Sequence, residues 1–546
     1  MAKQFIHTLK EKAGQVNWTL LIFLLLVLNV KLVIKVAAVI LICIINRKKT
    51  QPGDFFKQRY LFFYFGMIAI GLINLVLQIK QVNTTYLMTV VLGAGFWMMS
   101  AVIAYQLYTM VQHETKEKLH NTVTVFFILH IVVVFLDLLQ IMIETGSINP
   151  YTYMGLNVKY YMSTGDYITG ISFDAPVTTA MICAFGLLYF LFRQKFLLSM
   201  ACMAALIIMA SNFTNLLLVG VFIFAFAFYS NKIQKSFIVL YLVMLIVFMV
   251  KISAKNYEHI GRLVYQVINK PYDLPPVKVY TIDELTKIPD SSLNADERKR
   301  KYARIYIDSM NAIRLGADYK EPVSILEQKI IADTAGKVKD SAFYEFKESP
   351  AVEENINRYA HFLKQAYTAG EQDSLAKQYN WNAPGKWIAT KQLVHFFRDH
   401  KTKMVFGNGI ANFSSRLAFK ATMLDIGGRY PQKLKYIHSD FFMNHLYAYL
   451  YFHSKEQMLH KASNTPDSVY HQVAGEYGIA GLVILLLLYL GFFIRRVRGR
   501  SFGLPLLLLL ADAFFGEYWF EQFSVVVLFE LLFFIDMKER REELKV

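Results

Sequence analysis

Long apolar runs constrain this chain more than any other feature. The first, from Trp18 to Asn46, is broken only by Asn29 and Lys31. Further runs lie at approximately 59–79, 86–108, 122–144, 170–192, 196–212, 213–230, 236–251, 472–494, 503–516 and 519–536. A helix needs roughly 20 apolar residues to cross a bilayer, and lipid does not tolerate unpaired backbone. Because 17–46 is basic at both ends, we expect a helical hairpin there and about twelve crossings in all. The predicted fold class is an all-α polytopic membrane protein.

The composition agrees with this class. Hydrophobic residues make up 55% of the chain and charged residues only 18%, against roughly a quarter charged in soluble domains. This disfavours a purely cytosolic enzyme. The three cysteines, Cys43, Cys183 and Cys202, all lie in apolar runs, so no disulfide framework is implied.

The placement of basic residues predicts the topology. If the N-terminus lies in the cytoplasm, most basic loop residues also lie on the cytoplasmic side: Lys57/Arg59, Lys116/Lys118, Arg193/Lys195, Lys232/Lys235, Arg495–Arg500 and the tail from Lys538. This is the positive-inside pattern. It predicts a transmembrane bundle over 1–251, an extracytoplasmic domain over 252–471, and C-terminal transmembrane helices with a cytoplasmic tail over 472–546. We expect this domain to be mainly helical, with a charge-balanced part (252–380), a basic part (381–437), and a helix and motif (438–471).

The basic part holds about 10 Lys/Arg against 2 acids by count. Outside the cytoplasm, such a surface suits lipid headgroups or a phosphorylated substrate, or is simply a solvated face; we expect no nucleic-acid partner there. Its loop 406–413 reads Phe-Gly-Asn-Gly-Ile-Ala-Asn-Phe. Gly407 and Gly409 allow backbone N–H groups to turn toward an anion. Arg416 and Lys420 follow, so the pattern predicts a phosphate-binding mouth.

Four histidines within 435–461 do not predict a metal site. They are spaced 7, 8 and 7 residues apart, at His438, His445, His453 and His460. At a rise of 1.5 Å per residue, neighbours on one helix lie about 11 Å apart, too far for one ion. We interpret this segment as an aromatic-rich helix near the membrane surface.

Residues 465–481 read Thr-Pro-Asp-Ser-Val-Tyr-His-Gln-Val-Ala-Gly-Glu-Tyr-Gly-Ile-Ala-Gly. This segment resembles the signature of the bacterial O-antigen ligase/polymerase family, a Pro-His-Asn-like start followed by Glu-x-Gly-x-x-Gly at a membrane helix. The 406–413 loop is similar to the family's other landmark, and one large external segment late in the chain also fits. The resemblance covers the membrane plan and about 385–490.

The resemblance implies a membrane glycosyltransferase of the C type in the bacterial inner (cytoplasmic) membrane. Such an enzyme polymerises or ligates a polyprenyl-diphosphate-linked glycan onto a glycan or lipid acceptor at the outer face, with no cofactor and no metal. Its partners would be membrane lipids and possible envelope polysaccharide assembly proteins. Family arginines hold the diphosphate and a histidine sits at the reacting centre. This chain departs from the family in three places. Asp467 and Ser468 occupy the positions of the motif's His-Asn. Ser211-Asn212 occupies the position of a family Ser-Arg pair, and Lys386 occupies a position where the family frequently has an arginine.

The candidate catalytic residues are therefore Asp467, as the base, and His471, one turn further on. The candidate substrate-binding residues are Lys386, Gly407, Gly409, Arg416, Arg429, Ser468 and Glu476. Asp467 is equally suited to be only the N-cap of the next helix. Glu517 and Glu521 either pair with external arginines or accept from a sugar hydroxyl.

Two other functions stay open. One is a transporter or flippase for a glycan lipid. The other is a non-catalytic scaffold of an envelope polysaccharide assembly, with 252–380 as its docking domain.

Overall fold

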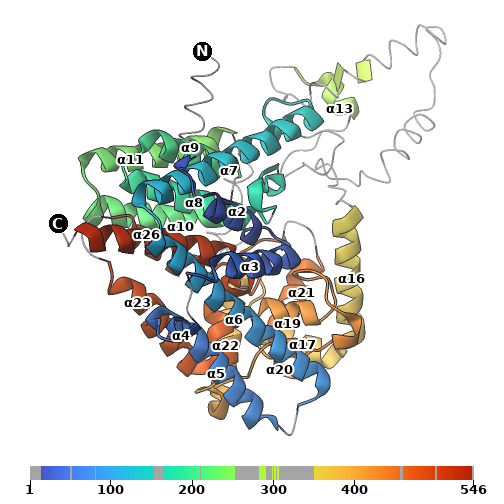
Figure 1. Cartoon of the computed structure of the whole chain (residues 1–546). Coiled ribbons are helices and arrows are strands. Elements are labelled where there is room, and N and C mark those ends of the chain that lie inside the picture. The colour runs from blue at the N-terminus through green and yellow to red at the C-terminus, as the bar shows by residue number, and fades with distance from the viewer. Residues whose placement is uncertain are drawn as a thin grey trace. The chain divides into compact units, whose positions relative to one another are not determined.

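A computed structural model gives the arrangement of the helices (Figure 1). It describes residues 14–49, 52–79, 82–152, 164–173, 175–209, 211–252, 282–289, 298, 301–302, 304–305, 350–455, 459–497 and 501–543. These residues form helices, turns and loops and contain no β-strand. The predicted all-α class is confirmed for this part of the chain.

The N-terminal half is a succession of apolar helices. They are α2 (Trp18–Val27), α3 (Leu32–Asn46), α4 (Pro52–Phe55), α5 (Phe62–Leu77), α6 (Thr84–His113), α7 (Lys116–Thr145), α8 (Pro176–Phe192), α9 (Phe196–Ile208), α10 (Asn212–Phe224) and α11 (Lys232–Val247). Short π-helical segments continue α10 to Tyr229 and α11 to Ile252. The apolar run 17–46 is divided into α2 and α3, which pack against each other as a hairpin.

The C-terminal half mixes polar and apolar helices. They are α16 (Pro350–Ala366), α17 (Ala369–Gln378), α18 (Gly385–Asp399), α19 (Arg416–Ala421), α20 (Ser439–Phe441), α21 (Tyr447–His453), α22 (Val469–Ile484), α23 (Gly491–Ile494), α24 (Gly503–Ala513), α25 (Trp519–Gln522) and α26 (Ser524–Glu543). The expected span 519–536 is not continuous, because Phe523 adopts a φ of 69° between α25 and α26.

Five helical segments of the described chain are long and apolar enough to cross a membrane: Arg59–Leu77, Thr84–His113, Lys116–Thr145, Lys232–Ile252 and Val469–Ile494. Shorter apolar helices accompany them, among them α2, α3, α8, α9 and α24. The length and composition of these helices indicate a membrane protein.

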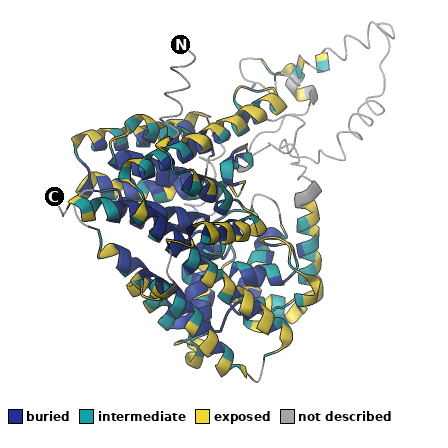
Figure 2. Ribbon diagram, viewed as in Figure 1, coloured by how far each residue is buried: buried dark blue, intermediate teal, exposed yellow. Residues whose placement is uncertain are grey.

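The core lies where α8, α26 and their neighbours meet. Every residue of α8 from Thr178 to Phe192 is buried, and so is every residue of α26 from Ser524 to Met537. A helix that is buried all round belongs at the centre of a bundle, whereas α11 buries one face only. Figure 2 shows the same contrast between the buried interior and the exposed outer faces.

The contacts divide the chain into two compact units, residues 1–269 with 354–546, and residues 270–353. The second unit is described only in short pieces, such as α13 (Ile282–Lys287). Much of the predicted charge-balanced part, at 253–281 and 306–349, lies outside the described residues. In the first unit, polar helices pack directly on apolar ones: α18 contacts α22, and α19 contacts α6.

The histidine segment differs from the single helix expected over 435–461. Its helical part runs from Ser439 to His453, with a π-helical turn at Phe442–Leu446. His438 is the N-cap of this helix, and its ring accepts from the Asp440 N–H. His460 lies beyond the helix and stacks on His453, with ring centroids 4.8 Å apart. The segment is therefore helical only in its middle part, and the four histidines do not lie on one continuous helix.

Candidate functional site

The two sequence landmarks form one structural unit. α22 is interrupted at Gly478, which has φ 68° and ψ −163°. The N–H groups of the next two residues, Ile479 and Ala480, donate to the carbonyl oxygens of Met404 and Val405, each at 2.9 Å. We call the segments 404–415 and 475–481 together the loop–helix joint.

Hydrogen bonds in the opposite direction, from the loop to α22, complete this joint. The Asn408 and Gly409 N–H groups donate to the carbonyl oxygens of Gly475 and Glu476, each at 2.9 Å. The two backbones approach so closely that a Cβ on Gly478 would lie 2.4 Å from the Val405 carbonyl oxygen. The spacing of glycines in both landmarks thus has a packing reason.

The loop does not form the predicted anion cradle. The Gly407 N–H donates to the Lys403 carbonyl oxygen at 2.7 Å, and the next two N–H groups are used by α22 as described. The side chains of Asn408 and Asn412 are fully buried, and each amide donates to the other residue's carbonyl oxygen. Because these donors already have protein acceptors, the assignment of Gly407 and Gly409 to phosphate binding is wrong.

Glu476 belongs to the same joint. Its side chain is fully buried, and Oε1 accepts from the Ser414 N–H at 3.2 Å. Its carbonyl oxygen accepts from Gly409 and, at 3.2 Å, from the Asn74 amide of α5. The motif glutamate thus holds the loop against α22 and α5, rather than lining a surface that a substrate reaches.

Four charged residues meet beside this joint, and we call them the acid–cation cluster: Lys386, Arg416, Asp467 and Glu517. Lys386 lies in the first turn of α18, Arg416 begins α19, Asp467 precedes α22, and Glu517 lies between α24 and α25. The Lys386 ammonium donates to the carbonyl oxygen of Asp467 and, at 3.1 Å, to that of Gly516. One cation therefore fixes both segments that carry the carboxylates.

The environment of the cluster shifts two of its pKa values. Burial raises the pKa of Asp467, and the negative charge of Glu517 raises it further, while Lys386 and Arg416 oppose the rise. Burial lowers the pKa of Lys386, against the opposing effect of Asp467 and Glu517. A carboxylate with a raised pKa is a better proton acceptor than an ordinary aspartate, and such groups are typical of catalytic sites.

Asp467 is not the N-cap of α22. That position belongs to Ser468, whose Oγ accepts from the Tyr470 N–H at 3.2 Å and donates to the Phe514 carbonyl oxygen at 2.9 Å. The capping interpretation of Asp467 is therefore wrong. Ser468 is fully buried, so its hydroxyl supports α22 and is closed to a ligand.

His471 lies behind the cluster. Its Nδ1 lies 3.1 Å from the Pro466 carbonyl oxygen, and its Nε2 lies 2.9 Å from the Thr390 hydroxyl. Both ring nitrogens are thus occupied by the segments that carry Asp467 and Lys386. His471 is placed to orient these segments, and its ring does not bond the Asp467 carboxylate.

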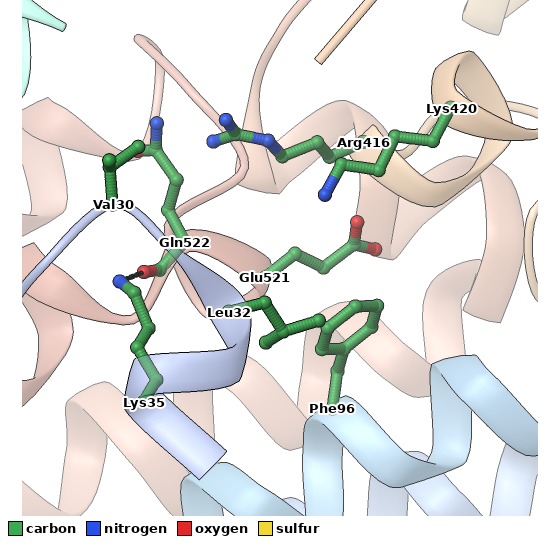
Figure 3. Close-up of a pocket in the computed structure, with 8 residues that line it drawn as sticks. All are labelled: Val30, Leu32, Lys35, Phe96, Arg416, Lys420, Glu521 and Gln522. Carbon is green, nitrogen blue, oxygen red and sulfur yellow. Dashed lines mark hydrogen bonds between the residues drawn. The ribbon is translucent and has the colours of Figure 1, made fainter. Parts of the chain in front are cut away.

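A small cavity of about 30 Å³ lies on the other side of Arg416 and is open to the surface (Figure 3). It is lined by Val30, Leu32, Lys35, Phe96, Arg416, Lys420, Glu521 and Gln522. Three cations face one carboxylate, and apolar side chains from α3 and α6 complete the wall. The cavity is therefore amphiphilic, with an excess of positive charge.

Glu521 organises this cavity. Its Oε2 accepts from the Leu417 N–H at 2.7 Å, and its Oε1 accepts from the Gln472 amide at 2.6 Å. These bonds tie α25 to α19 and α22. Arg416 has a buried Nη1 without a hydrogen-bond partner, and its charge acts on both Asp467 and Glu521. Arg416 thus connects the cavity to the acid–cation cluster.

The remaining candidate, Arg429, is exposed. It follows Gly427 and Gly428, which pack beside the side chains of Arg416 and Lys420, so it lies at the edge of the same region. Lys35 was not anticipated as a site residue, although a lysine inside an apolar run is itself a functional signal. It is buried, and its ammonium donates to the Gln522 carbonyl oxygen at 2.5 Å.

Comparisons of the chain with protein-family models, with curated proteins and with solved structures find no match.

Proposed function

We propose that this protein is an integral-membrane glycosyltransferase that polymerises or ligates a polyprenyl-diphosphate-linked glycan. The observation that carries the proposal is the acid–cation cluster. It sets a carboxylate with a raised pKa next to fixed cations, beside a cavity that is cationic on one side and apolar on the other. A diphosphate on a lipid chain has matching chemistry, an anionic group attached to an apolar tail.

In this proposal, Asp467 takes the proton of the acceptor hydroxyl as its oxygen attacks the anomeric carbon. The bond from that carbon to the diphosphate breaks, and the diphosphate leaves with the bonding electron pair. Negative charge grows on the leaving group, so cations fixed beside it stabilise the transition state more than the ground state. Arg416 supplies paired donors for this, and Lys420 lines the same cavity.

The proposed topology places this chemistry at the outer face of the bacterial inner membrane. About twelve crossings, cytoplasmic termini and an extracytoplasmic segment over 252–471 follow from the positive-inside pattern of the loops. The outer position of the acid–cation cluster is supported by its place at the start of the segment Val469–Ile494, whose other end is followed by the basic residues Arg495 and Arg496. The acceptor would be a glycan or lipid reaching that face.

A flippase for the same lipid is the second candidate, because two helices are broken, one of them directly after the cavity-lining residue Gln522. α22 is interrupted at Gly478, and the last helix is interrupted at Phe523. Discontinuous helices that meet at a binding site are typical of transporters. The two functions differ in where the uncoupled lipid-linked unit would accumulate.

The test uses a deletion strain of the source organism, complemented with the wild-type chain or with Asp467→Asn. Glycan gels and lipid extracts report chain length, and a membrane-impermeant periodate label reports the leaflet in which lipid-linked units accumulate. We expect Asp467→Asn, at normal protein level, to leave short lipid-linked units in the outer leaflet. Accumulation in the inner leaflet would favour the flippase, and full rescue would remove Asp467 from the mechanism.

Asp373→Asn is the matched control, because it makes the same chemical change at an exposed position of α17. We expect it to restore the wild-type glycan profile. An unchanged glycan profile in the deletion strain itself would contradict both functions.

A further inference from the structure

One face of α18 exposes large apolar side chains. Trp387 is 56% exposed and Val394 is 60% exposed, while Ile388, Ala389 and Phe396 on the opposite face are buried. The two exposed residues are seven positions apart, so they lie on one side of the helix. Contiguous exposed apolar surface commonly marks a binding surface for a membrane or a protein.

Cations share this face. Lys391 and Arg398 are exposed and complete the spacing i, i+4, i+7, i+11 that begins at Trp387. The Lys391 ammonium lies 5.8 Å from the centroid of the Trp387 indole ring. We call these four residues, Trp387, Lys391, Val394 and Arg398, the α18 stripe. An apolar row interleaved with cations is the pattern of helices that lie at a lipid interface.

The chain that follows the α18 stripe contacts the apolar part of α22. Beyond α18, Met404 and Val405 are also exposed, and their carbonyl oxygens accept from the N–H groups of Ile479 and Ala480. From this point α22 and the π-helical segment that continues it (Leu485–Leu490) present an outward row of apolar residues: Ile479, Val483, Leu486 and Leu487. This row belongs to the segment Val469–Ile494, which is long and apolar enough to span a membrane. We therefore expect the surface next to the stripe to face lipid.

We propose that the α18 stripe docks on the surface of the membrane that α22 spans. Trp387 and Val394 enter the headgroup layer, and Lys391 and Arg398 contact the phosphates of anionic lipids. Tryptophan is enriched at this layer, and basic residues near an anionic lipid surface are attracted to it. The proposal rests on α22 crossing a membrane and is independent of glycan transfer.

Lipid is favoured over a partner protein for two reasons. The stripe is continuous with the lipid-facing row through Met404 and Val405, and its cations complement an anionic headgroup layer. The direction of the chain also predicts a depth order: residue 405, bonded to α22, lies deepest, residue 394 lies at intermediate depth and residue 387 is the most shallow.

The test places a nitroxide label on the full-length chain in nanodiscs that contain one-third anionic lipid. Single cysteines replace Val405, Val394 and Trp387 in turn, and Ser374→Cys, at an exposed position of the polar helix α17, serves as the water-exposed control. The chain without an added cysteine reports the background labelling of Cys43, Cys183 and Cys202. Collisions with oxygen and with a water-soluble nickel chelate measure the depth of each label.

We expect the ratio of oxygen to nickel accessibility to fall from 405 to 394 to 387, with all three values above that of Ser374→Cys. We also expect Lys391→Gln with Arg398→Gln to make the Val394 label at least twofold more accessible to nickel. In zwitterionic nanodiscs, the same two substitutions should have no effect. A Val394 label as accessible to nickel as the Ser374 label would overturn the proposal, and so would protection that does not depend on lipid charge.

Discussion

The acid–cation cluster lies at the start of α22 and the loop–helix joint lies further along the same helix. The joint is held by backbone hydrogen bonds, whereas the cluster brings together charged side chains. In the joint, the N–H groups of residues 407–409 all donate to backbone carbonyl oxygens, and Glu476 Oε1 accepts from the Ser414 N–H, while its Oε2 is buried without a hydrogen-bond partner among the described residues. In the cluster, the negative charge of Glu517 acts on Asp467, and burial raises the pKa of Asp467 above its ordinary value.

This contrast separates architecture from chemistry within a single sequence motif. A polar group that is fully paired inside a protein stabilises the fold, because an unpaired one would be costly. Carboxylates that repel each other cost stability and are kept where a reaction uses them. The two regions should therefore respond differently to substitution.

Gly478→Ala is expected to have the largest effect, and the effect is on folding. The new Cβ would lie 2.4 Å from the Val405 carbonyl oxygen, at a φ of +68° that side chains rarely adopt. We expect the free energy of unfolding to fall by about 3 kcal/mol or more, measured as loss of folded protein on size-exclusion chromatography and a lower thermal midpoint.

Gly95→Ala is the matched control for this change. Its Cβ would meet no heavy atom within 4 Å on α6, so replacing a helical glycine should leave stability unchanged or raise it by about 0.5–1 kcal/mol. Equal losses in both variants would show that the joint has no special role.

Asp467→Asn is expected to have the next largest effect, and the effect is on transfer. Removal of a general base typically costs about 10²–10⁴-fold in rate, so we expect at least a 100-fold loss of glycan transfer in proteoliposomes. The thermal midpoint should stay close to that of the wild type, because Lys386 bonds the Asp467 carbonyl oxygen and not its carboxylate. If Asp467→Asn instead lowered stability and kept the wild-type rate per folded molecule, Asp467 would have a structural role and not a catalytic one.

Glu517→Gln is expected to have a smaller effect, seen in the pH dependence. Transfer needs the ionised form of Asp467, so activity is lost as the pH falls through its raised pKa. Removing the negative charge of Glu517 lowers that pKa, and the acidic limb of the pH–rate profile should move down by on the order of one pH unit. A profile that moves upward, or does not move, would mean that the two carboxylates do not interact.

The sequence predicted the helices well, because apolar runs of this length have few other solutions. It also singled out both glycine landmarks, but it did not predict that they would meet in one joint. It could not predict how their hydrogen bonds are used: the loop N–H groups of Gly407 and Gly409 serve α22, and spacing alone does not distinguish a carbonyl acceptor from a phosphate.

The site was predicted only in part for a similar reason. Lys386, Arg416 and Asp467 are separated by 30 or more positions, and their meeting depends on how α18, α19 and α22 pack. The other carboxylate, Glu517, lies just after the short helix α24. No local sequence pattern marks the end of that helix. Interpreting Asp467 as an N-cap failed by one position, because Ser468 is an equally good cap residue.

Ser468→Ala is expected to have the smallest effect, and it tests that one-position difference. Loss of the N-cap oxygen should lower the free energy of unfolding by about 1 kcal/mol, seen as a small fall in the thermal midpoint. The rate of transfer per folded molecule should not change, because Ser468 Oγ bonds only backbone groups, at Tyr470 and Phe514. If Ser468→Ala instead lost activity at an unchanged thermal midpoint, the serine would have to be assigned to the acid–cation cluster. The catalytic residues would then include the N-cap of α22.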